Sequence, residues 1–361
     1  LNKHNTSLKI LKGQIDDVWK NLVTTYDIQK VYLNKDYEPY AIKRDQKIKD
    51  FLNSKGIEMK SFKDQVIFEE DEIVKADGKT YTVFTPYKRK WLEKFTKVNL
   101  NSIVNFDNFY KKIIDFPSLN QLGLKNSTIK VKKYSLKNVA TYSETRNFPN
   151  LDSTSYLSPH LRFGTISVRQ IIIELKNKSE TFLSELIWRE FFMQILWHFP
   201  HTTKRSFKDK YERIEWRNDM EDFKLWCDGK TGYPIVDAGM NQLNKTGFMH
   251  NRLRMVVGSF LCKHLLIDWR LGEKYFADKL FDYEQASNVG NWQWVAGCGV
   301  DAAPYFRIFN PESQQKKFDK DLLYIKKWIP NFEENNYIKK IVEHKFARER
   351  CLNTYKKALN K

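Results

Sequence analysis

The segment that begins ELIWREFF places four chemically distinct side chains on one face of an expected helix. They are Glu185, Trp188, Arg189 and Phe192, at the i, i+3, i+4, i+7 spacing of neighbours on a helix. Opposite charges on an apolar helix face must pair with each other or face a bound molecule, because an unpaired buried charge is costly. An internal Glu185–Arg189 ion pair and a ligand-facing pair both remain open from these residues alone.

A second candidate group lies in HNRLRM, residues 250–255. Asn251 and Met255 are one helical turn apart, and Arg252 and Arg254 flank them. An asparagine can read the edge of a base, an arginine can hold a phosphate, and a methionine gives a polarisable contact to a flat ring. Alone the pattern is weak, since a methionine in a helix is more commonly part of the core.

Hydroxyl side chains gather in STSYLSPHLRFG, residues 153–164, before an expected helix. Hydroxyl and free N–H groups at a helix start can cradle phosphate. They also fit simple N-capping by Ser158, with Pro159 at the first helical position. The segment contains neither a Walker-type nor a GxGxxG pattern, so it does not indicate a Rossmann-type nucleotide grip.

Two tryptophans lie among small residues in NVGNWQWVAGCG, residues 288–299. The stretch could be a tight core turn or the floor of a pocket for a flat molecule. We favour the pocket floor, in which Gly290, Gly297 and Gly299 let the backbone approach a flat ring closely. The i, i+2 spacing of Trp292 and Trp294 need not place both rings on one face.

The charge balance points to a polyanionic partner. The 361 residues carry a formal net charge of +18, with 15% aromatic residues, a combination that often meets nucleic acid. Lysines that merely coat the surface are the alternative. The four cysteines form no CxxC pair, which argues against a zinc site or a disulfide framework and fits a reduced, intracellular setting. No signal peptide is seen, and no apolar run approaches membrane-span length. We expect no metal and no membrane association.

The pattern of elements predicts two domains. Residues 30–34 and 57–69 read as strands around a helix at 36–56, a β-α-β pattern typical of a parallel sheet. Later segments read as helices, at 182–199, 251–267, 320–329 and 338–359. The predicted fold is an incomplete Rossmann-like α/β domain over 1–95, a connection over 96–140, and a larger all-helical domain over 141–361.

The helical half resembles the photolyase/cryptochrome flavoprotein family, most closely the bacterial class I cyclobutane pyrimidine dimer photolyases. The matching stretches occur in the family's order: TSYLSPHLRFGTIS, ELIWREFF, DGKTGYPIVDAGMNQLNKTGFMHNRLRM, LLIDWRLGEKYF, DYEQASNVGNWQWVAGCGVDAAPYFRIFNP and IVEHKFARE. Residues 81–91, YTVFTPYKRKW, resemble the latter part of the family's antenna-binding α/β domain. The family's opening strand is absent, so we expect an N-terminal truncation.

The resemblance implies non-covalent FAD, active as FADH⁻, in the helical domain. It assigns FAD contacts to Tyr142, Thr154, Ser155, Leu157, Ser158, Arg189, Arg254, Asp282, Glu284 and Asn288. In it, Arg254 and Asp282 form a charged pair beside the isoalloxazine, and Asn288 faces flavin N5. The antenna pigment, of folate, deazaflavin or flavin type, cannot be read from the sequence.

The resemblance further implies light-driven repair of UV-damaged DNA by electron transfer to a flipped-out pyrimidine dimer. It places Glu185, Trp188, Asn251, Arg252, Met255, Trp294 and Arg307 at the substrate or its phosphates. Glu185, Asn251, Met255, Asn288 and Trp294 are the catalytic candidates, and Trp216, Trp269 and Trp292 form an electron chain to the flavin. We expect a monomer in the cytoplasm, associated with the nucleoid when it is bound to DNA.

Two positions depart from the family pattern. Glu284 stands where the family more often has Asp, and Phe248 where close relatives often have Trp. Three other functions are alternatives: a cryptochrome-like blue-light photoreceptor with the same FAD fold, repair of the (6-4) photoproduct, and a nucleic-acid-binding protein without flavin. Asn288 and the pocket residues favour dimer repair over the photoreceptor.

Overall fold

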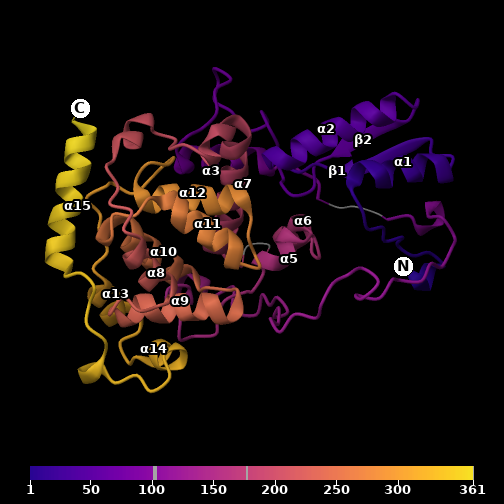
Figure 1. The fold of residues 1–361 in the computed structure, drawn as a ribbon. Coiled ribbons are helices and arrows are strands. Elements are labelled where there is room, and N and C mark those ends of the chain that lie inside the picture. Colours follow the sequence, from indigo (N-terminus) through magenta and orange to yellow (C-terminus); the bar gives the residue numbers. More distant parts are fainter. Residues whose placement is uncertain (101–103, 176–177, 361) are drawn as a thin grey trace. The chain divides into compact units, whose positions relative to one another are not determined.

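The computed structural model describes residues 1–100, 104–175 and 178–360, which form two compact units (Figure 1). The first unit comprises Leu1–Asp64 and Lys97–Lys130, and the second comprises Gln65–Thr96 and Val131–Lys361. The predicted domain boundaries at 95 and 140 stay a prediction. Residues 101–103, in the predicted connection, and 176–177 and 361, in the predicted helical domain, lie outside the described residues.

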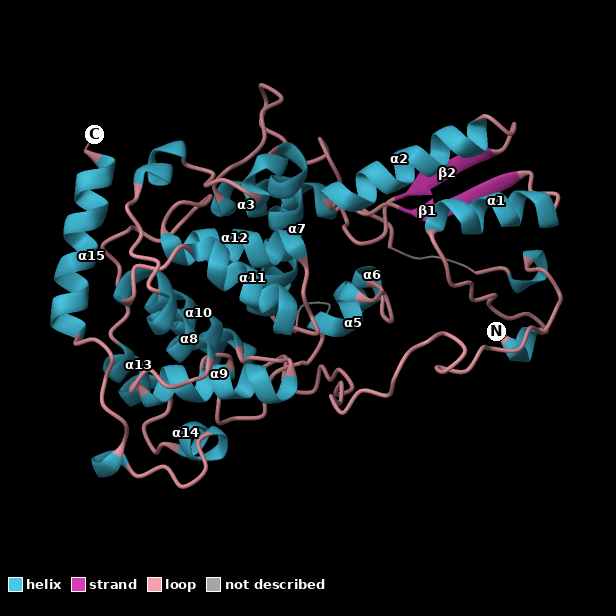
Figure 2. Cartoon of the chain, in the orientation of Figure 1, coloured by secondary structure: helices cyan, strands magenta, loops and turns pink. Residues whose placement is uncertain are grey.

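The first unit contains the predicted parallel β-α-β element (Figure 2). Strands β1 (Lys30–Asn34) and β2 (Glu58–Phe62) pair in parallel, with Lys30 opposite Glu58. Helix α2 (Pro39–Asn53) connects them, and α1 (Ile15–Thr25) precedes β1. Ile48, Leu52 and Ile57 form a small buried cluster. The α/β character predicted for this part of the chain is therefore confirmed.

The predicted strand over 57–69 is wrong beyond Phe62. Residues 65–70 belong to the second unit, and their backbone groups bond to side chains instead of a neighbouring strand. The main-chain N–H groups of Ile67 and Phe68 donate to the two carboxylate oxygens of Glu190, at 2.6 and 3.1 Å. The carbonyl of Phe68 accepts from the amide of Gln194, at 3.2 Å. These bonds satisfy a buried backbone that a strand pattern alone assigns to a sheet.

The second unit is helical, as predicted for residues after 141 (Figure 2). Its α-helices are α3 (Phe84–Phe95), α4 (Tyr142–Thr145), α5 (Ser158–Arg162), α6 (Val168–Leu175), α7 (Glu180–His198), α8 (Met220–Cys227), α9 (Pro234–Thr246), α10 (Asn251–Ser259), α11 (Trp269–Lys279), α12 (Gln285–Ala296), α13 (Pro311–Phe318), α14 (Leu323–Trp328) and α15 (His344–Leu359). Its core includes Trp226, Trp269 and Trp292, all at most 3% exposed.

Helix α7 is the structural centre of the candidate site. Its side chains are apolar around most of its circumference, which is typical of a buried helix. The hydroxyl of Ser179 caps its first turn by accepting from the N–H of Phe182, at 3.2 Å. Helix α7 packs against α3, α4 and α12.

None of the described helices is both long and apolar enough to cross a membrane.

The predicted helix over 251–267 changes its winding midway. Helix α10 ends at Ser259 and continues as one π-helical turn, Phe260–His264. Within that turn, the buried Lys263 donates from Nζ to the carbonyl of Ala296, at 2.8 Å. This hydrogen bond satisfies a carbonyl in the last turn of α12. Lys263 therefore connects the π-helical turn to the end of α12, the helix that carries Asn288.

Candidate functional site

A cavity of about 520 Å³ opens within the helical unit. Residues from α4, α5, α7, α10, α11 and α12 and their connecting segments form its walls. All predicted FAD contacts line it: Tyr142, Thr154, Ser155, Leu157, Ser158, Arg189, Arg254, Asp282, Glu284 and Asn288. Most predicted substrate residues do so as well: Glu185, Trp188, Asn251, Met255 and Trp294. Segments 150 residues apart in the sequence thus meet at one hollow.

One wall of the cavity is built around the carboxylate of Asp282. Its side chain is 1% exposed and pairs with the guanidinium of Arg254, at 2.9 Å. The hydroxyl of Ser158 donates to the same carboxylate, at 2.6 Å. The predicted Arg254–Asp282 pair therefore forms. The alternative prediction, N-capping by Ser158, is wrong. Leu157 is the N-cap residue of helix α5, and the Ser158 hydroxyl donates to Asp282 instead.

Glu284 acts as the N-cap of α12. Its two carboxylate oxygens accept from the backbone N–H groups of Ala286 and Ser287, both at 2.9 Å. Negative charge at a helix start is favourable, because the first N–H groups have no partner within the helix. Glutamate therefore meets the capping need at a position where the family more often has aspartate.

Asn288 is held one turn further along α12. Its side-chain nitrogen donates to the carboxylate of Glu273, at 2.9 Å, and to the Glu273 carbonyl, at 3.1 Å. Burial raises the pKa of the Glu273 carboxyl, and the hydrogen bond from Asn288 opposes that shift. Glu273, on α11, fixes the orientation of an amide that lines the cavity. Glu273 lies within the stretch LLIDWRLGEKYF, but the resemblance assigns it no role.

Glu185 pairs with an arginine that sequence reasoning missed. Arg146, directly after α4, contacts the Glu185 carboxylate, with 2.5 Å between Nη1 and Oε1. Burial raises the pKa of Glu185, while Arg146 lowers it. The alternative Glu185–Arg189 pair is not formed, because Arg189 donates to the carbonyl of Gln65, at 2.6 Å. Arg146 lies 39 residues before Glu185, and no local pattern in the sequence connects the two positions.

The two tryptophans of the 288–299 stretch lie on a helix and not in a turn. Because they are two residues apart on helix α12, Trp292 and Trp294 point in directions that differ by about 200° around the helix axis. Trp292 is 3% exposed and packs in the core, whereas Trp294 is only partly buried. Both nonetheless contribute atoms to the cavity wall.

The glycines of this stretch have other roles than predicted. A Cβ at Gly290 would lie 2.3 Å from the ring of Phe192, so the flat ring it approaches is a core side chain. Gly297 has a φ of 92° and terminates α12. A Cβ at Gly299 would meet Gln293 at 2.8 Å. None of the three is among the residues that form the cavity wall in the described part of the chain.

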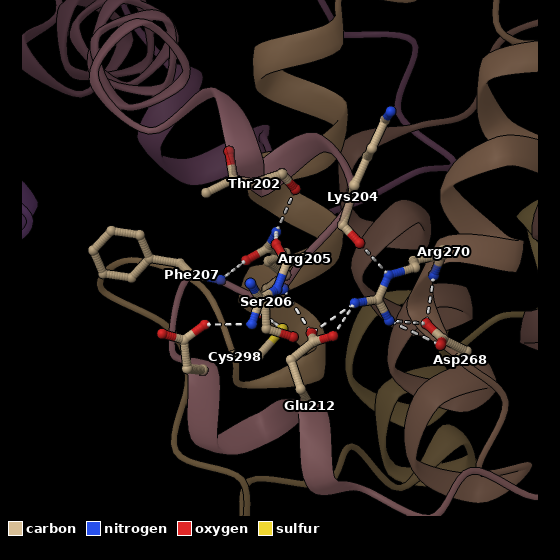
Figure 3. Close-up of polar contacts among 11 residues, drawn as sticks. Thr202, Lys204, Arg205, Ser206, Phe207, Glu212, Asp268, Arg270 and Cys298 are labelled. Carbon is tan, nitrogen blue, oxygen red and sulfur yellow. Dashed lines mark hydrogen bonds and ion pairs between the residues drawn. The ribbon is translucent and has the colours of Figure 1, made fainter.

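Gln293, between the two tryptophans, fastens α12 to the segment after α7. Its side-chain oxygen accepts from the N–H of Phe207, at 2.8 Å. Its nitrogen donates to the carbonyls of Thr202 and Arg205, at 2.8 and 3.0 Å. Figure 3 shows this region, in which Glu212 lies between Ser206 and Arg270, and Arg270 reaches on to Asp268.

The other two predicted electron carriers lie away from the cavity wall. Trp269 begins α11, is 1% exposed, and has no acceptor for its indole N–H among the described residues. Trp216 is partly buried and meets the ring of Tyr355 edge-on, with centroids 6.0 Å apart. A Cβ at Gly272 of α11 would lie 2.2 Å from the Trp292 ring, so α11 packs closely against Trp292.

Two predicted phosphate contacts also lie outside the cavity wall. Arg252 donates from Nη2 to Oδ1 of Asn147, at 2.5 Å, and lies over the ring of Phe318, 4.4 Å from its centroid. Arg307 is exposed. The role of Arg252 and Arg307 as phosphate contacts stays a prediction.

Two family models match the chain. Residues 182–336 match a family described as the FAD binding domain of DNA photolyase. Residues 1–104 match a family described as DNA photolyase. The first range contains all but the first two residues of α7 and the whole of α10, α11 and α12, which together supply about half of the cavity wall.

Characterised relatives and solved structures agree with these matches. A deoxyribodipyrimidine photo-lyase of Vibrio cholerae is 37% identical over 93% of this chain and 81% of the relative. A bacterial class III photolyase from Agrobacterium tumefaciens superposes with a TM-score of 0.83, at 33% identity, over 97% of this chain and 83% of its own. An archaeal photolyase from Sulfolobus tokodaii, solved with two FAD molecules, gives a TM-score of 0.76 at 31% identity, over 94% and 82% of the two chains.

Proposed function

Because the chain belongs to the DNA photolyase family, we propose that it is a deoxyribodipyrimidine photo-lyase, a flavoenzyme that repairs UV-damaged DNA in light. The observation that carries the proposal is that all ten predicted FAD contacts and five of the predicted substrate contacts line one and the same cavity. The relatives reported above carry photolyase names, which favours repair over the photoreceptor alternative.

The cavity suits FAD in its chemistry. The Ser155 hydroxyl and the N-terminus of α5 offer donors for the cofactor's phosphates and hydroxyls, and the Ser158 oxygen, whose proton is given to Asp282, can accept from its hydroxyls. Arg254 is neutralised by Asp282, so together they present a polar but balanced surface to the ring system. Asn288, fixed by Glu273, presents an amide instead of a carboxylate, which avoids a fixed negative charge beside a reduced flavin.

When bound, reduced FAD supplies the electron that light drives to the dimer, and the chain's own residues bind and orient the substrate. Trp188 and Trp294 offer flat aromatic surfaces to the two fused pyrimidines. Glu185 and Asn251 can hydrogen-bond to their edges. Arg146 holds the Glu185 carboxylate in place before substrate arrives.

The net charge of +18 supports binding to the DNA backbone. Release of counterions should supply affinity and make that affinity fall steeply with salt. The dimer must leave the base stack to reach the cavity, and unstacking costs less for bases that are already damaged. Arg252 and Arg307 stay our candidates for phosphate contacts.

Several finer assignments belong to the proposal. Trp292, Trp269 and Trp216 would carry electrons from the surface to oxidised flavin, in that order from the flavin. The chain would act as a monomer in the cytoplasm and join the nucleoid when it binds DNA. The antenna pigment stays open. Class I also stays a prediction, since the Agrobacterium structure is described as a class III photolyase.

The deciding experiment is illumination of the chemically reduced protein with an oligonucleotide that contains one thymine dimer. Monomer thymines should appear in blue light and not in the dark. The purified protein should also show a flavin absorption spectrum. A flavin-free protein that binds DNA would favour the simple nucleic-acid-binding alternative, and a flavoprotein that leaves the dimer intact would favour the photoreceptor.

A further inference from the structure

The aromatic wall of the cavity is supported from behind by a residue far away in the sequence. The rings of Phe84 and Trp188 are stacked, with centroids 3.7 Å apart and planes 9° from parallel. Phe84 is 7% exposed, while Trp188 is partly buried and lines the cavity. One face of the Trp188 indole therefore rests on a phenyl ring, which leaves its remaining surface to contribute to the wall.

Phe84 is the first residue of α3, which packs against α7 within the helical unit. The buried Glu190 of α7 accepts from the indole nitrogen of Trp91, at 2.6 Å, and from the hydroxyl of Tyr87, at 3.5 Å. Because Tyr87 and Trp91 both belong to α3, one carboxylate ties that helix to the helix that carries Trp188.

The same carboxylate also fixes the chain that leads to α3. Glu190 accepts from the backbone of Ile67 and Phe68, as described above. Arg169 donates to the carbonyl of Val66, at 2.9 Å, and His198 contacts the carbonyl of Glu70, at 3.2 Å. Residues 66–70 are therefore anchored at successive backbone positions to α6 and α7.

Further contacts fix both the backbone and the ring of Phe84. The N–H of Phe84 donates to the carboxylate of Asp301, at 3.3 Å. Its ring meets that of Phe191 edge-on, with centroids 5.8 Å apart, and Phe191 meets the indole of Trp188 in the same way, at 5.5 Å. Three rings thus constrain one another, and the plane of Trp188 is set before any ligand enters.

We propose that Phe84 is a positioning residue for dimer recognition: it holds the Trp188 indole in the plane that stacks against the flipped-out pyrimidines. This inference rests on the proposed function and extends it to a residue outside the cavity wall. A side chain that is already ordered loses less conformational freedom when the substrate binds, so preorganisation should raise the affinity for the dimer specifically. Binding of undamaged DNA depends on backbone contacts and should not change.

The test compares dark binding of two oligonucleotides, one with a single thymine dimer and one without damage, by the FAD-loaded protein. Phe84→Leu should weaken dimer binding by about three- to tenfold, the scale of an aromatic pair, and leave binding of undamaged DNA unchanged. Phe84→Tyr, which keeps the ring, should restore dimer binding. The flavin absorption spectrum reports whether the cofactor site is intact in each variant.

Phe68→Leu is the matched control. Phe68 is a buried phenylalanine of the same anchored segment, and it also packs on a tryptophan, Trp91, with centroids 5.5 Å apart. Its loss should lower thermal stability without changing the ratio of the two affinities. If Phe84→Leu does not fold, Phe84→Met, which keeps more of the volume and lacks the ring, is used for the same measurement.

A double-variant cycle separates positioning from general packing. In a Trp188→Phe background, Phe84→Leu should have less effect on dimer affinity, because the two changes act on one wall. Wild-type selectivity in Phe84→Leu, or an equal loss in Phe68→Leu, would overturn the inference. A wild-type protein with no preference for the dimer contradicts the proposed function itself, which is a distinct result.

Discussion

The guanidinium of Arg270 lies over the indole of Trp269, 4.9 Å from the ring centroid. Two carboxylates hold it there (Figure 3). Glu212 binds its Nη2 at 2.6 and 2.8 Å, and Asp268 binds its Nη1 at 2.9 and 3.2 Å. A bare cation beside Trp269 would oppose removal of an electron from that ring, and two anions more than compensate it. The group as a whole carries one negative charge.

This arrangement predicts that Glu212→Gln slows photoreduction of the oxidised flavin. The change keeps the size of the side chain but leaves the group without net charge, so a positive charge on Trp269 loses stabilisation. For unit charges roughly 10 Å apart at an effective dielectric constant of about 20, the loss is about 1–2 kcal/mol. Transient absorption of the photoreduction step measures it.

Glu312→Gln is the control for that measurement. Glu312 also pairs with a cation, Lys340, at 2.8 Å, but it lies on α13. It should leave photoreduction unchanged. Repair by chemically reduced protein should be normal in both variants, since no electron then crosses Trp269. Normal photoreduction in Glu212→Gln would show that the Glu212 carboxylate does not influence electron transfer through Trp269.

Trp216→Phe tests the outer end of the proposed electron chain. Phenylalanine is much harder to oxidise, so photoreduction of oxidised FAD should slow strongly, whereas repair after chemical reduction should remain. The ring contact with Tyr355 is kept by the phenyl group, which limits the structural effect. Equal loss of both activities would contradict a role limited to electron supply. Phe223→Leu is the packing control, because Phe223 lies on α8 and is not one of the proposed electron carriers.

Local patterns in the sequence predicted several elements of the fold, but not helix α12, which the 288–299 stretch did not indicate. Residues 30–34 form the predicted strand, because an alternating segment next to an amphipathic helix has few alternatives. Helix α7 matches its predicted range within two residues at its start. The gathering of pocket residues on one cavity came from the family resemblance, since spacing alone left an ion pair or a core turn equally open.

Pairs between distant segments could not be predicted. Arg146 and Glu185 are 39 residues apart, and neither sequence neighbourhood identifies the other. Residues 65–70 look like a strand because three buried apolar residues, Val66, Ile67 and Phe68, follow one another there, yet side chains of α7 satisfy much of their backbone. Gly290 is required by the ring of Phe192, almost a hundred residues earlier. Such requirements arise from three-dimensional packing and leave no local pattern.

Trp294→Ala should weaken binding of dimer-containing DNA by about 1–3 kcal/mol, the usual value of one stacked base on an aromatic side chain. Trp294 is partly buried and lines the cavity, so truncation removes surface from the wall more than from the core. Dark titration with damaged and undamaged oligonucleotides measures the effect. Trp328→Ala, on α14 and outside the cavity wall, is the control. Unchanged dimer affinity in Trp294→Ala would show that Trp294 does not contact the substrate.

His250 should make the folded state sensitive to mild acid. It is 3% exposed, and its Nδ1 accepts from the N–H of Arg252 at the start of α10. Among the described residues, its Nε2 has no hydrogen-bond partner. Burial, reinforced by Arg252 and Arg254, lowers the pKa of His250 to about 4.

The sign of the effect follows from that direction. An unfolded chain binds a proton at His250 near pH 6.5, whereas the folded chain does so only near pH 4, so stability falls as the pH drops between these values. A shift of this size corresponds to about 3 kcal/mol. His250→Asn keeps a good N-cap and removes the titration, so its urea midpoint should change less between pH 7 and pH 5 than that of the wild type.

His201→Asn, at an exposed position, is the matched control and should follow the wild-type profile. His264 is also buried, and burial lowers its pKa to about 3, so some acid sensitivity should persist in His250→Asn. The double variant His250→Asn/His264→Asn should lose more of it. The same pH dependence in His250→Asn and the wild type would mean that His250 is not a buried neutral group, and its capping of α10 would then need another explanation.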